Sequence, residues 1–229
     1  MNSRRPVFLL TSLLTTTSLL TSGRAAVLAE TSFDSAVKSG SSQTMTEITW
    51  TGENLAAFTP SSSVTTAASN NSGYFTTGFG ATGFAPDQNI ENEGPWTATF
   101  EFTLASGTTV TLTDIFFNYA ALTNSGASQG TNFRAQNFDI SVNGSAFDDQ
   151  KQTTAVNGSL AFTDSVAFNP GLNSVTITAS EVSGAGYNMG IDNLSFEGDL
   201  TVIPEPSALV LGGLGLCALV GRRRRMTRS

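Results

Sequence analysis

The chain has 229 residues, of which 39% are hydrophobic and 13% are charged, with one cysteine and no histidine. Cys217 alone cannot form an intrachain disulfide, and the lack of histidine excludes Ser-His-Asp and Cys-His catalysis and the usual zinc sites. From Glu30 to Glu205, three basic residues stand against eighteen acidic ones, a net charge of −15 that argues against nucleic-acid binding. Such a charge favours the binding of cations or of neutral partners such as sugars. The alternative is an acidic surface that is solvated and binds nothing specific.

The first 29 residues have the layout of a secretory signal peptide. Arg4 and Arg5 precede an apolar stretch, and Val27-Leu28-Ala29 offers small side chains to signal peptidase. We therefore expect an N-terminal signal helix over residues 1–29 and cleavage after Ala29. An uncleaved hydrophobic anchor is the alternative, although the serines and threonines that interrupt the apolar run argue against a stable span.

The next segments are less regular. Residues 30–45 are rich in serine and threonine and predict a linker or a first strand, whereas Glu47 to Thr51 predicts an early strand. Thr59 to Asn71 is again poor in large apolar residues. Gly73 to Pro95 predicts a long loop region whose aromatic residues either fill the core or contribute to binding.

Strict alternation from Trp96 to Leu104 predicts a half-buried strand, and a change of parity within the run Val110 to Tyr119 predicts a bulge near Asp114. Asn143-Gly144 and Asn157-Gly158 suit type I′ hairpin turns. Further alternating runs cover residues 138–142, 166–168, 175–179 and 190–196. Short strands at this spacing predict an all-β fold over residues 46–200, an antiparallel β-sandwich or jelly roll.

Residues 202–229 combine three features in order. An extended Pro204-Glu205-Pro206 is followed by the apolar run Ser207 to Val220 and then by Arg222, Arg223, Arg224 and Arg225. The apolar run spans only about 21 Å as a helix, against a hydrocarbon core of about 30 Å. The four arginines would hold the tail on the cytoplasmic side, so we expect a short C-terminal transmembrane helix.

This tail resembles the PEP-CTERM sorting signal of Gram-negative bacteria that make extracellular polysaccharide. The resemblance implies recognition of Pro204, Glu205 and Pro206 by an exosortase. It also implies an inner-membrane intermediate, followed by transfer of the exported protein to the cell surface or extracellular matrix. The alternative is a simple tail anchor that is never cut.

The body resembles galactose-binding-like jelly rolls through residues 100–104, 110–119, 138–144 and 190–196. Those domains often hold a structural calcium ion. In an alternating strand, Asp192 falls on the same side as its apolar neighbours and would point inward, where a carboxylate needs a partner. Together with carboxylates from Glu30, Asp34 or Glu47 and backbone carbonyls, it would offer the oxygen ligands that Ca²⁺ prefers. A bulge at Asp192-Asn193 that turns the aspartate outward is the alternative.

Two classes of function remain open. The first is a non-catalytic surface or matrix protein that binds carbohydrate through exposed aromatic residues. The candidates are Trp50, Tyr74, Trp96, Tyr119 and Tyr187, with Trp96 the poorest because its alternation places it on the core face. The alternative is a small glycan-active hydrolase that uses paired carboxylates, either Asp148-Asp149 or Glu91 and Glu93. The short body favours a protein that is not an enzyme.

Overall fold

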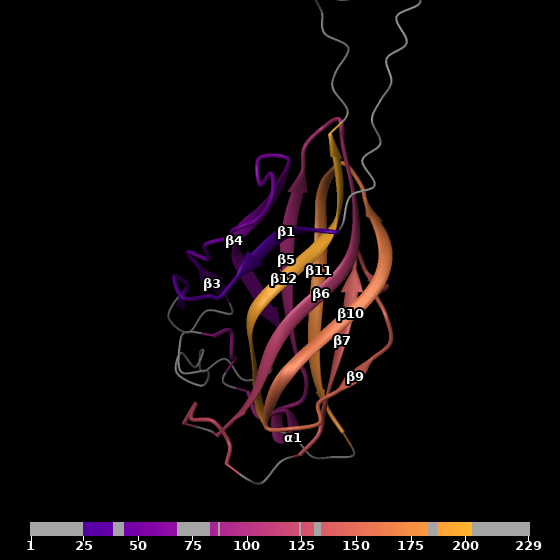
Figure 1. The fold of residues 1–229 in the computed structure, drawn as a ribbon. Helices are drawn as coiled ribbons and strands as arrows, with labels where there is room; N and C mark the ends of the chain where they lie inside the picture. Colours follow the sequence, from indigo (N-terminus) through magenta and orange to yellow (C-terminus); the bar gives the residue numbers. More distant parts are fainter. Residues whose placement is uncertain are drawn as a thin grey trace, which may run out of the picture.

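The computed structural model describes residues 25–38, 44–67, 83–86, 88–123, 125–130, 134–182 and 187–202. These residues form two antiparallel sheets packed face to face (Figure 1), which confirms the predicted all-β sandwich. The elements are β1 (Ala26–Thr31), β2 (Val37–Lys38), β3 (Thr44–Thr46), β4 (Phe58–Ala67), α1 (Ile90–Glu93), β5 (Trp96–Leu104), β6 (Thr108–Leu122), β7 (Gln136–Val142), β8 (Ser145–Ala146), β9 (Lys151–Gln152), β10 (Asn157–Phe168), β11 (Gly171–Glu181) and β12 (Asn188–Val202).

The two sheets divide the chain unevenly. The smaller sheet has the strand order β1-β12-β6-β10, and the larger has the order β2-β3-β4-β5-β11-β7-β8, with β9 also paired to β7. Strands β6 and β12, of 15 residues each, form the long central pair of the smaller sheet. The last strand of the body is therefore an interior strand, bonded to β1 on one side and to β6 on the other.

Side-chain alternation explains why β5 and β6 form where they do. In β5, every second residue from Trp96 to Leu104 is buried, as predicted. Against β12, Asp114 of β6 pairs with Glu197, and Leu112 pairs with the next residue, Gly198. On this side β6 therefore has one extra residue, Thr113, which confirms the bulge expected near Asp114 from the change of parity. Against β10, the extra residue lies on β10 instead, between Thr163 and Val166.

The two Asn-Gly pairs behave differently. Asn143 and Gly144 have φ of 50° and 80° and connect β7 to β8, which confirms the predicted hairpin turn. The turn predicted at Asn157-Gly158 is wrong, because these residues begin β10 and pair with Ala120 and Tyr119 of β6. Pairing with a long neighbouring strand overrides the local turn preference there.

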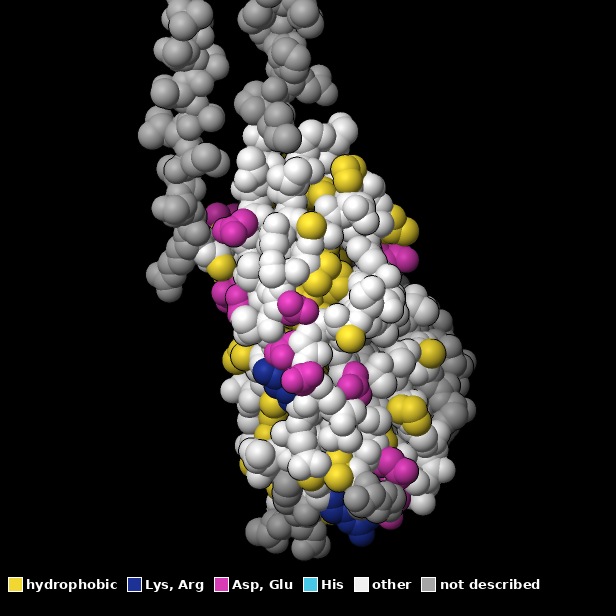
Figure 2. Space-filling model, turned by 90° about the vertical axis from the view of Figure 1, so that its right-hand side faces the viewer, with side chains coloured by type: hydrophobic (Ala, Val, Ile, Leu, Met, Phe, Trp, Pro, Cys, Tyr) yellow, Lys and Arg dark blue, Asp and Glu magenta, His cyan; other side chains and the backbone are white. Residues whose placement is uncertain are grey.

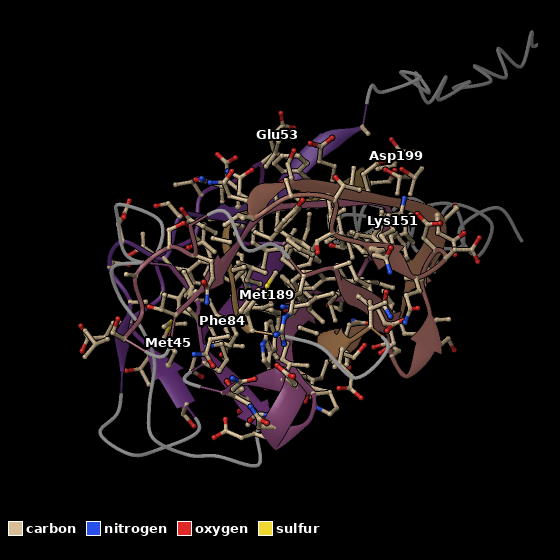
Figure 3. The ribbon with its side chains drawn as sticks, turned by 90° about the horizontal axis from the view of Figure 1, so that it is seen from below. Met45, Glu53, Phe84, Lys151, Met189 and Asp199 are labelled. Atoms are coloured by element: carbon tan, nitrogen blue, oxygen red, sulfur yellow. The ribbon has the colours of Figure 1, made fainter. Side chains whose placement is uncertain are left out.

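Aromatic side chains join the two sheets. Phe102 of β5 meets Phe196 of β12 at a ring-centroid distance of 4.8 Å, and Phe117 of β6 meets Phe138 of β7 at 5.1 Å. Viewed from below, Phe84 and Met189 lie in the interior between the sheets (Figure 3). Edge-to-face and tilted ring pairs of this kind add stability beyond the area that they bury, so the core fixes how the sheets face each other.

Strand β1 bears on the predicted signal cleavage. Leu28 and Ala29 are fully buried, and Ala29 pairs with Phe196. Cleavage after Ala29 would remove four of the six residues of β1. Gly23 and Ala25 supply the same pattern of small residues at −3 and −1, and cleavage after Ala25 would leave the strand whole.

Several predicted features lie outside the described residues. These are the N-terminal signal helix, Tyr74, the motif Pro204-Glu205-Pro206, and the C-terminal transmembrane helix with its arginines. Within the ranges given above, no helix has the length and apolar character needed to cross a bilayer.

Candidate functional site

A pocket of about 470 Å³ lies where β1 and the turn after it face the bulge of β12. The eight described residues that line it have hydrophilic side chains, and none of these eight is basic. They are Glu30, Thr31, Ser32, Asp34, Ser35, Thr49, Thr51 and Asn193. We call this the hydrophilic pocket. Its volume falls within the range typical of small-molecule sites.

One wall of the hydrophilic pocket is made by the turn after β1. The Thr31 hydroxyl accepts a hydrogen bond from the backbone N–H of Phe33 at 3.1 Å. Phe33 has a φ of 58° and buries its ring completely in the core. The anchored ring and the left-handed backbone turn the chain so that Ser32 and Asp34 face the pocket, where the Ser32 hydroxyl donates to Asp34 at 2.7 Å.

The opposite wall comes from the segment that sequence alone predicts as a strand, Glu47 to Thr51. That prediction is wrong except at Thr51, which exchanges backbone hydrogen bonds of 2.7 and 2.9 Å with Glu30. Glu47 has a φ of 59°, and the Ser35 hydroxyl donates to its carbonyl while accepting the N–H of Thr49. A side chain thus takes the place of a neighbouring strand, and the segment curves around the pocket.

The bulge in β12 brings Asp192 and Asn193 to the pocket region. The register shifts between Asp192 and Ser195, and Asn193, with a φ of 48°, faces solvent. Asp192 itself is only 7% exposed, so the expected bulge occurs but turns the asparagine outward rather than the aspartate. The Asp192 carboxylate accepts hydrogen bonds from the backbone N–H and the side-chain amide of Asn193, at 2.7 and 3.4 Å.

The electrostatics of this region are acidic and unbalanced. Burial raises the pKa of Asp192, and the nearby charge of Asp34 raises it further, while the hydrogen bond from the Asn193 backbone opposes both effects. None of the described residues that line the pocket is a lysine or arginine, so no described basic side chain balances these charges. The region therefore favours hydrogen-bond donors or cations over anions.

The residues proposed for calcium are only partly brought together. Glu30 and Asp34 line the hydrophilic pocket, and Asp192 lies beside its lining residue Asn193, whereas Glu47 contributes its backbone carbonyl to Ser35. In the described ranges, no three acidic side chains are grouped closely enough to hold a metal ion. The oxygen atoms have the hard character that Ca²⁺ prefers, but the side chains do not form a complete ligand set.

Three of the four carboxylates suggested for a hydrolase, those of Glu91, Glu93 and Asp148, are engaged in local contacts. Glu91 forms an ion pair with Arg134, and Glu93 accepts the backbone N–H of Asn89 at 2.6 Å. Asp148 accepts hydrogen bonds from the Thr163 N–H at 2.8 Å and from Lys151 at 2.9 Å. These contacts lower the pKa of Asp148 to about 2, opposite to the shift that a general acid needs.

Asp148 instead stabilises the edge strand β10, and its replacement provides a test. The Thr163 hydrogen bond and then Lys151 lower its pKa from 3.8 to about 2, so its contribution is present above pH 4 and is lost as the pH falls toward 2. We expect Asp148→Asn to lower the free energy of unfolding at pH 7 by about 1 kcal/mol, allowing for solvent screening.

Urea unfolding of Asp148→Asn and wild type between pH 2 and 7 measures this contribution. The difference between the two proteins should shrink as the pH falls below 4. Asp199→Asn, at an exposed position of β12, is the control and should change stability by less than about 0.5 kcal/mol. A difference that is the same at pH 2 and pH 7 would contradict the role assigned to the Asp148 charge.

The described aromatic residues proposed for sugar stacking are buried or half-buried in the sandwich. Trp96 and Tyr119 are buried, and half-buried Trp50 donates its indole N–H to the Ser61 carbonyl at 2.7 Å. Tyr187 is half-buried and lies under the Arg134 guanidinium, 5.5 Å from the ring centroid. The described aromatic side chains therefore serve mainly as core, and the hydrophilic pocket is the better candidate site.

The surface charge agrees with a site for neutral or cationic ligands. Figure 2 shows acidic side chains scattered along one face of the sandwich, with basic side chains at few places. The described basic side chains Arg134 and Lys151 are each paired with an acidic partner. No basic patch is thus available in the described ranges to attract a polyanion.

Comparison with known proteins identifies the tail. Residues 202–225 match the PEP-CTERM protein-sorting motif, which confirms the resemblance seen in the sequence. The motif implies export and membrane-associated processing by an exosortase in a Gram-negative bacterium. No curated protein matches the chain.

Solved structures similar to the sandwich include carbohydrate-binding domains. A GH26-CBM35 β-(1,4)-mannanase from Podospora anserina is 18% identical, with a TM-score of 0.40, over 80% of this chain and 29% of that one. A family 35 carbohydrate-binding module from Clostridium thermocellum is 17% identical, with a TM-score of 0.28, over 44% and 69%. The chain spans less than a third of the mannanase. It is a β-sandwich protein that carries a PEP-CTERM protein-sorting motif.

Proposed function

We propose that the chain is an exported, non-catalytic protein of the cell surface or extracellular matrix whose sandwich binds neutral carbohydrate in the hydrophilic pocket. The sorting motif supports the destination. The observation that supports the ligand class is the lining of the pocket, to which the described residues contribute carboxylates, hydroxyls and one amide but no basic group. Sugar hydroxyls donate to carboxylates and accept from hydroxyls and amides, so this lining suits a polyhydroxylated, uncharged ligand.

Membrane retention is part of the same proposal. The apolar run Ser207 to Val220 holds the exported body at the inner membrane, with Arg222 to Arg225 on the cytoplasmic side. The exosortase then acts near Pro204-Glu205-Pro206 and releases the body toward the cell surface. A neutral extracellular polysaccharide is the partner that the acidic body would meet there without charge repulsion.

The non-catalytic assignment rests on the state of the carboxylates. Each of Glu91, Glu93 and Asp148 already accepts a structural hydrogen bond or ion pair. The described acid with a raised pKa, Asp192, has both oxygens engaged by Asn193. A glycosidase needs a protonated acid and a second carboxylate on either side of the scissile bond, and these contacts favour a binding protein instead.

Neutral oligosaccharides provide the test of the pocket. We expect an array of neutral glycans to yield at least one ligand whose dissociation constant, measured by calorimetry, rises at least tenfold in Asp34→Asn, because the variant loses a charged acceptor. Asp199→Asn removes a carboxylate outside the pocket lining and should bind as wild type does. The proposal fails if no neutral glycan binds at millimolar concentration, or if both variants bind equally.

Calcium is a second candidate ligand for the same pocket. The observation that favours it is the repulsion between Asp34, which lines the pocket, and Asp192, which lies beside its lining residue Asn193, because a cation would relieve this repulsion. With calcium at 100 times its dissociation constant, we expect about 2.7 kcal/mol of added stability, which EDTA should remove. Thermal melting of wild type and Asp34→Asn in calcium and in EDTA tests this; an unchanged melting temperature in wild type would reject the calcium site.

A further inference from the structure

The sorting motif continues directly from a strand of the sheet. Val202, the last residue of β12, still pairs with Thr108 of β6, and the motif match begins at Val202 itself. Only Ile203 separates this paired residue from Pro204. The folded body therefore reaches to within one residue of the peptide that the processing enzyme must recognise.

The strand register shows which end of the sandwich carries the tail. Gly171 pairs with Leu104 at the end of β5, so the β5–β6 turn and the β10–β11 turn lie at the end where β12 stops. Figure 1 shows the end of β12 beside the β5–β6 turn at the top of the view, with α1 at the bottom. We call residues 105–107, 169–170 and 201–202 the tail end of the sandwich.

The length of the tether limits how far the tail end can stand from a membrane. Five residue steps lead from Val202 to Ser207, where the apolar run begins, and five extended steps span at most about 17 Å. The polar region of one leaflet occupies about 5 to 8 Å outside the hydrocarbon core. With the apolar run embedded, the gap between the lipid headgroups and Val202 is therefore at most about 12 Å.

The tail end also has a surface that can approach lipid headgroups. Its two turns are Ala105-Ser106-Gly107 and Asn169-Pro170, which carry no charge. Of the three described large apolar residues that are exposed, Val202 at 49% is part of the tail end and Leu172 at 66% follows its β10–β11 turn, whereas Val37 lies on β2. Apolar side chains at the rim of an uncharged surface are suited to an interface with lipid.

We propose that the tail end is held against the membrane surface for as long as the apolar tail is embedded. The long axis of the sandwich then points away from the bilayer surface, with the tail end nearest the lipid. This inference rests on the proposed membrane retention. The hydrophilic pocket, where Thr31 pairs with Leu194 about 26 Å along β12 from Val202, stays clear of the lipid.

Fluorescence quenching tests this orientation in the full chain. In a Cys217→Ala background, Ser106→Cys places a fluorophore at the tail end. Ser159→Cys places one on β10 opposite Asn118, about 33 Å along β6 from Thr108. Both serines are exposed. In phosphatidylcholine vesicles that contain a headgroup-attached nitroxide lipid, we expect quenching of the Ser106→Cys label to exceed that of the Ser159→Cys label at least threefold.

A linker variant provides the matched control. Twelve Gly/Ser residues inserted between Val202 and Ile203 add a mean reach of about 19 Å, so quenching of the Ser106→Cys label should fall by at least half. Equal quenching at the two positions in protein that floats with the vesicles would overturn the orientation alone. Failure of the full chain to float with vesicles would overturn both the orientation and the membrane retention on which it rests.

Discussion

Gly198→Ala is expected to lower the free energy of unfolding by about 3 kcal/mol or more, because β12 and β6 approach each other too closely there for a side chain. A Cβ atom at Gly198 would lie 2.1 Å from the carbonyl oxygen of Thr111 and 3.1 Å from the Cα of Leu112. Both atoms belong to the backbone of the central strand pair. Relief would require the strands to separate at the register shift between Glu197 and Gly198.

Gly130→Ala is the matched control for this steric effect. Nothing lies within 4 Å of a Cβ atom built at Gly130, so its replacement should change stability by less than about 0.5 kcal/mol. Urea unfolding of the two variants and wild type gives the comparison. Equal stability of Gly198→Ala and Gly130→Ala would show that the two strands do not pack as closely as described.

Replacement of Pro204, Glu205 and Pro206 by alanine is expected to reduce the processed fraction of the exported protein at least tenfold. By its match to the sorting motif, this tripeptide is the segment that the exosortase reads. Because the variant keeps the apolar run and the arginines, the unprocessed protein should accumulate in the membrane fraction. Pulse-chase labelling followed by fractionation measures the two pools.

The control for the motif variant is Glu197→Ala. It removes an acidic residue from the same strand, five residues before the sorting match begins. Processing of this variant should equal that of wild type. If alanine in place of the tripeptide leaves processing unchanged, the tail acts as a simple anchor and the sorting assignment is wrong.

Alternation in the sequence predicted the strands that have one face in the core and one in solvent. Trp96 to Leu104 became β5 with the predicted pattern of burial, and the parity change in β6 located the bulge beside Asp114. These signals are local, because the alternation of apolar and polar residues can be seen within the sequence of the strand itself. The Asn-Gly signal is also local: it located the turn at Asn143-Gly144 but failed at Asn157-Gly158, where pairing with β6 prevails.

Features that depend on distant partners could not be predicted in this way. Strand β4 is rich in serine and threonine and gave no strand signal, yet it pairs with β5 from Phe58 to Ala67. The short helix α1 was hidden in the predicted loop before Trp96, where Asn89 caps it by accepting the Glu91 N–H. In both cases, neighbouring segments supply the stabilisation that the local sequence lacks.

The sequence predicts only part of the hydrophilic pocket. Its acidic members Glu30 and Asp34 can be grouped with Asp192, because a carboxylate that points into the core needs a partner. Its hydroxyl residues were missed, since the register of β1 against β12 and the Ser35 bridge to Glu47 and Thr49 bring them together. Their one signal in the sequence is the stretch 30–45, rich in serine and threonine, which resembles an ordinary linker.

The mass of the protein recovered from the cell surface tests the account most directly. We predict a body that begins at Ala26, which keeps β1 whole, and that has lost the apolar run and the arginines from Arg222 to Arg225. In a strain without its exosortase, the same protein should keep its tail and remain in the membrane fraction. Surface protein that still carries the intact arginine tail when the exosortase is present would contradict the account.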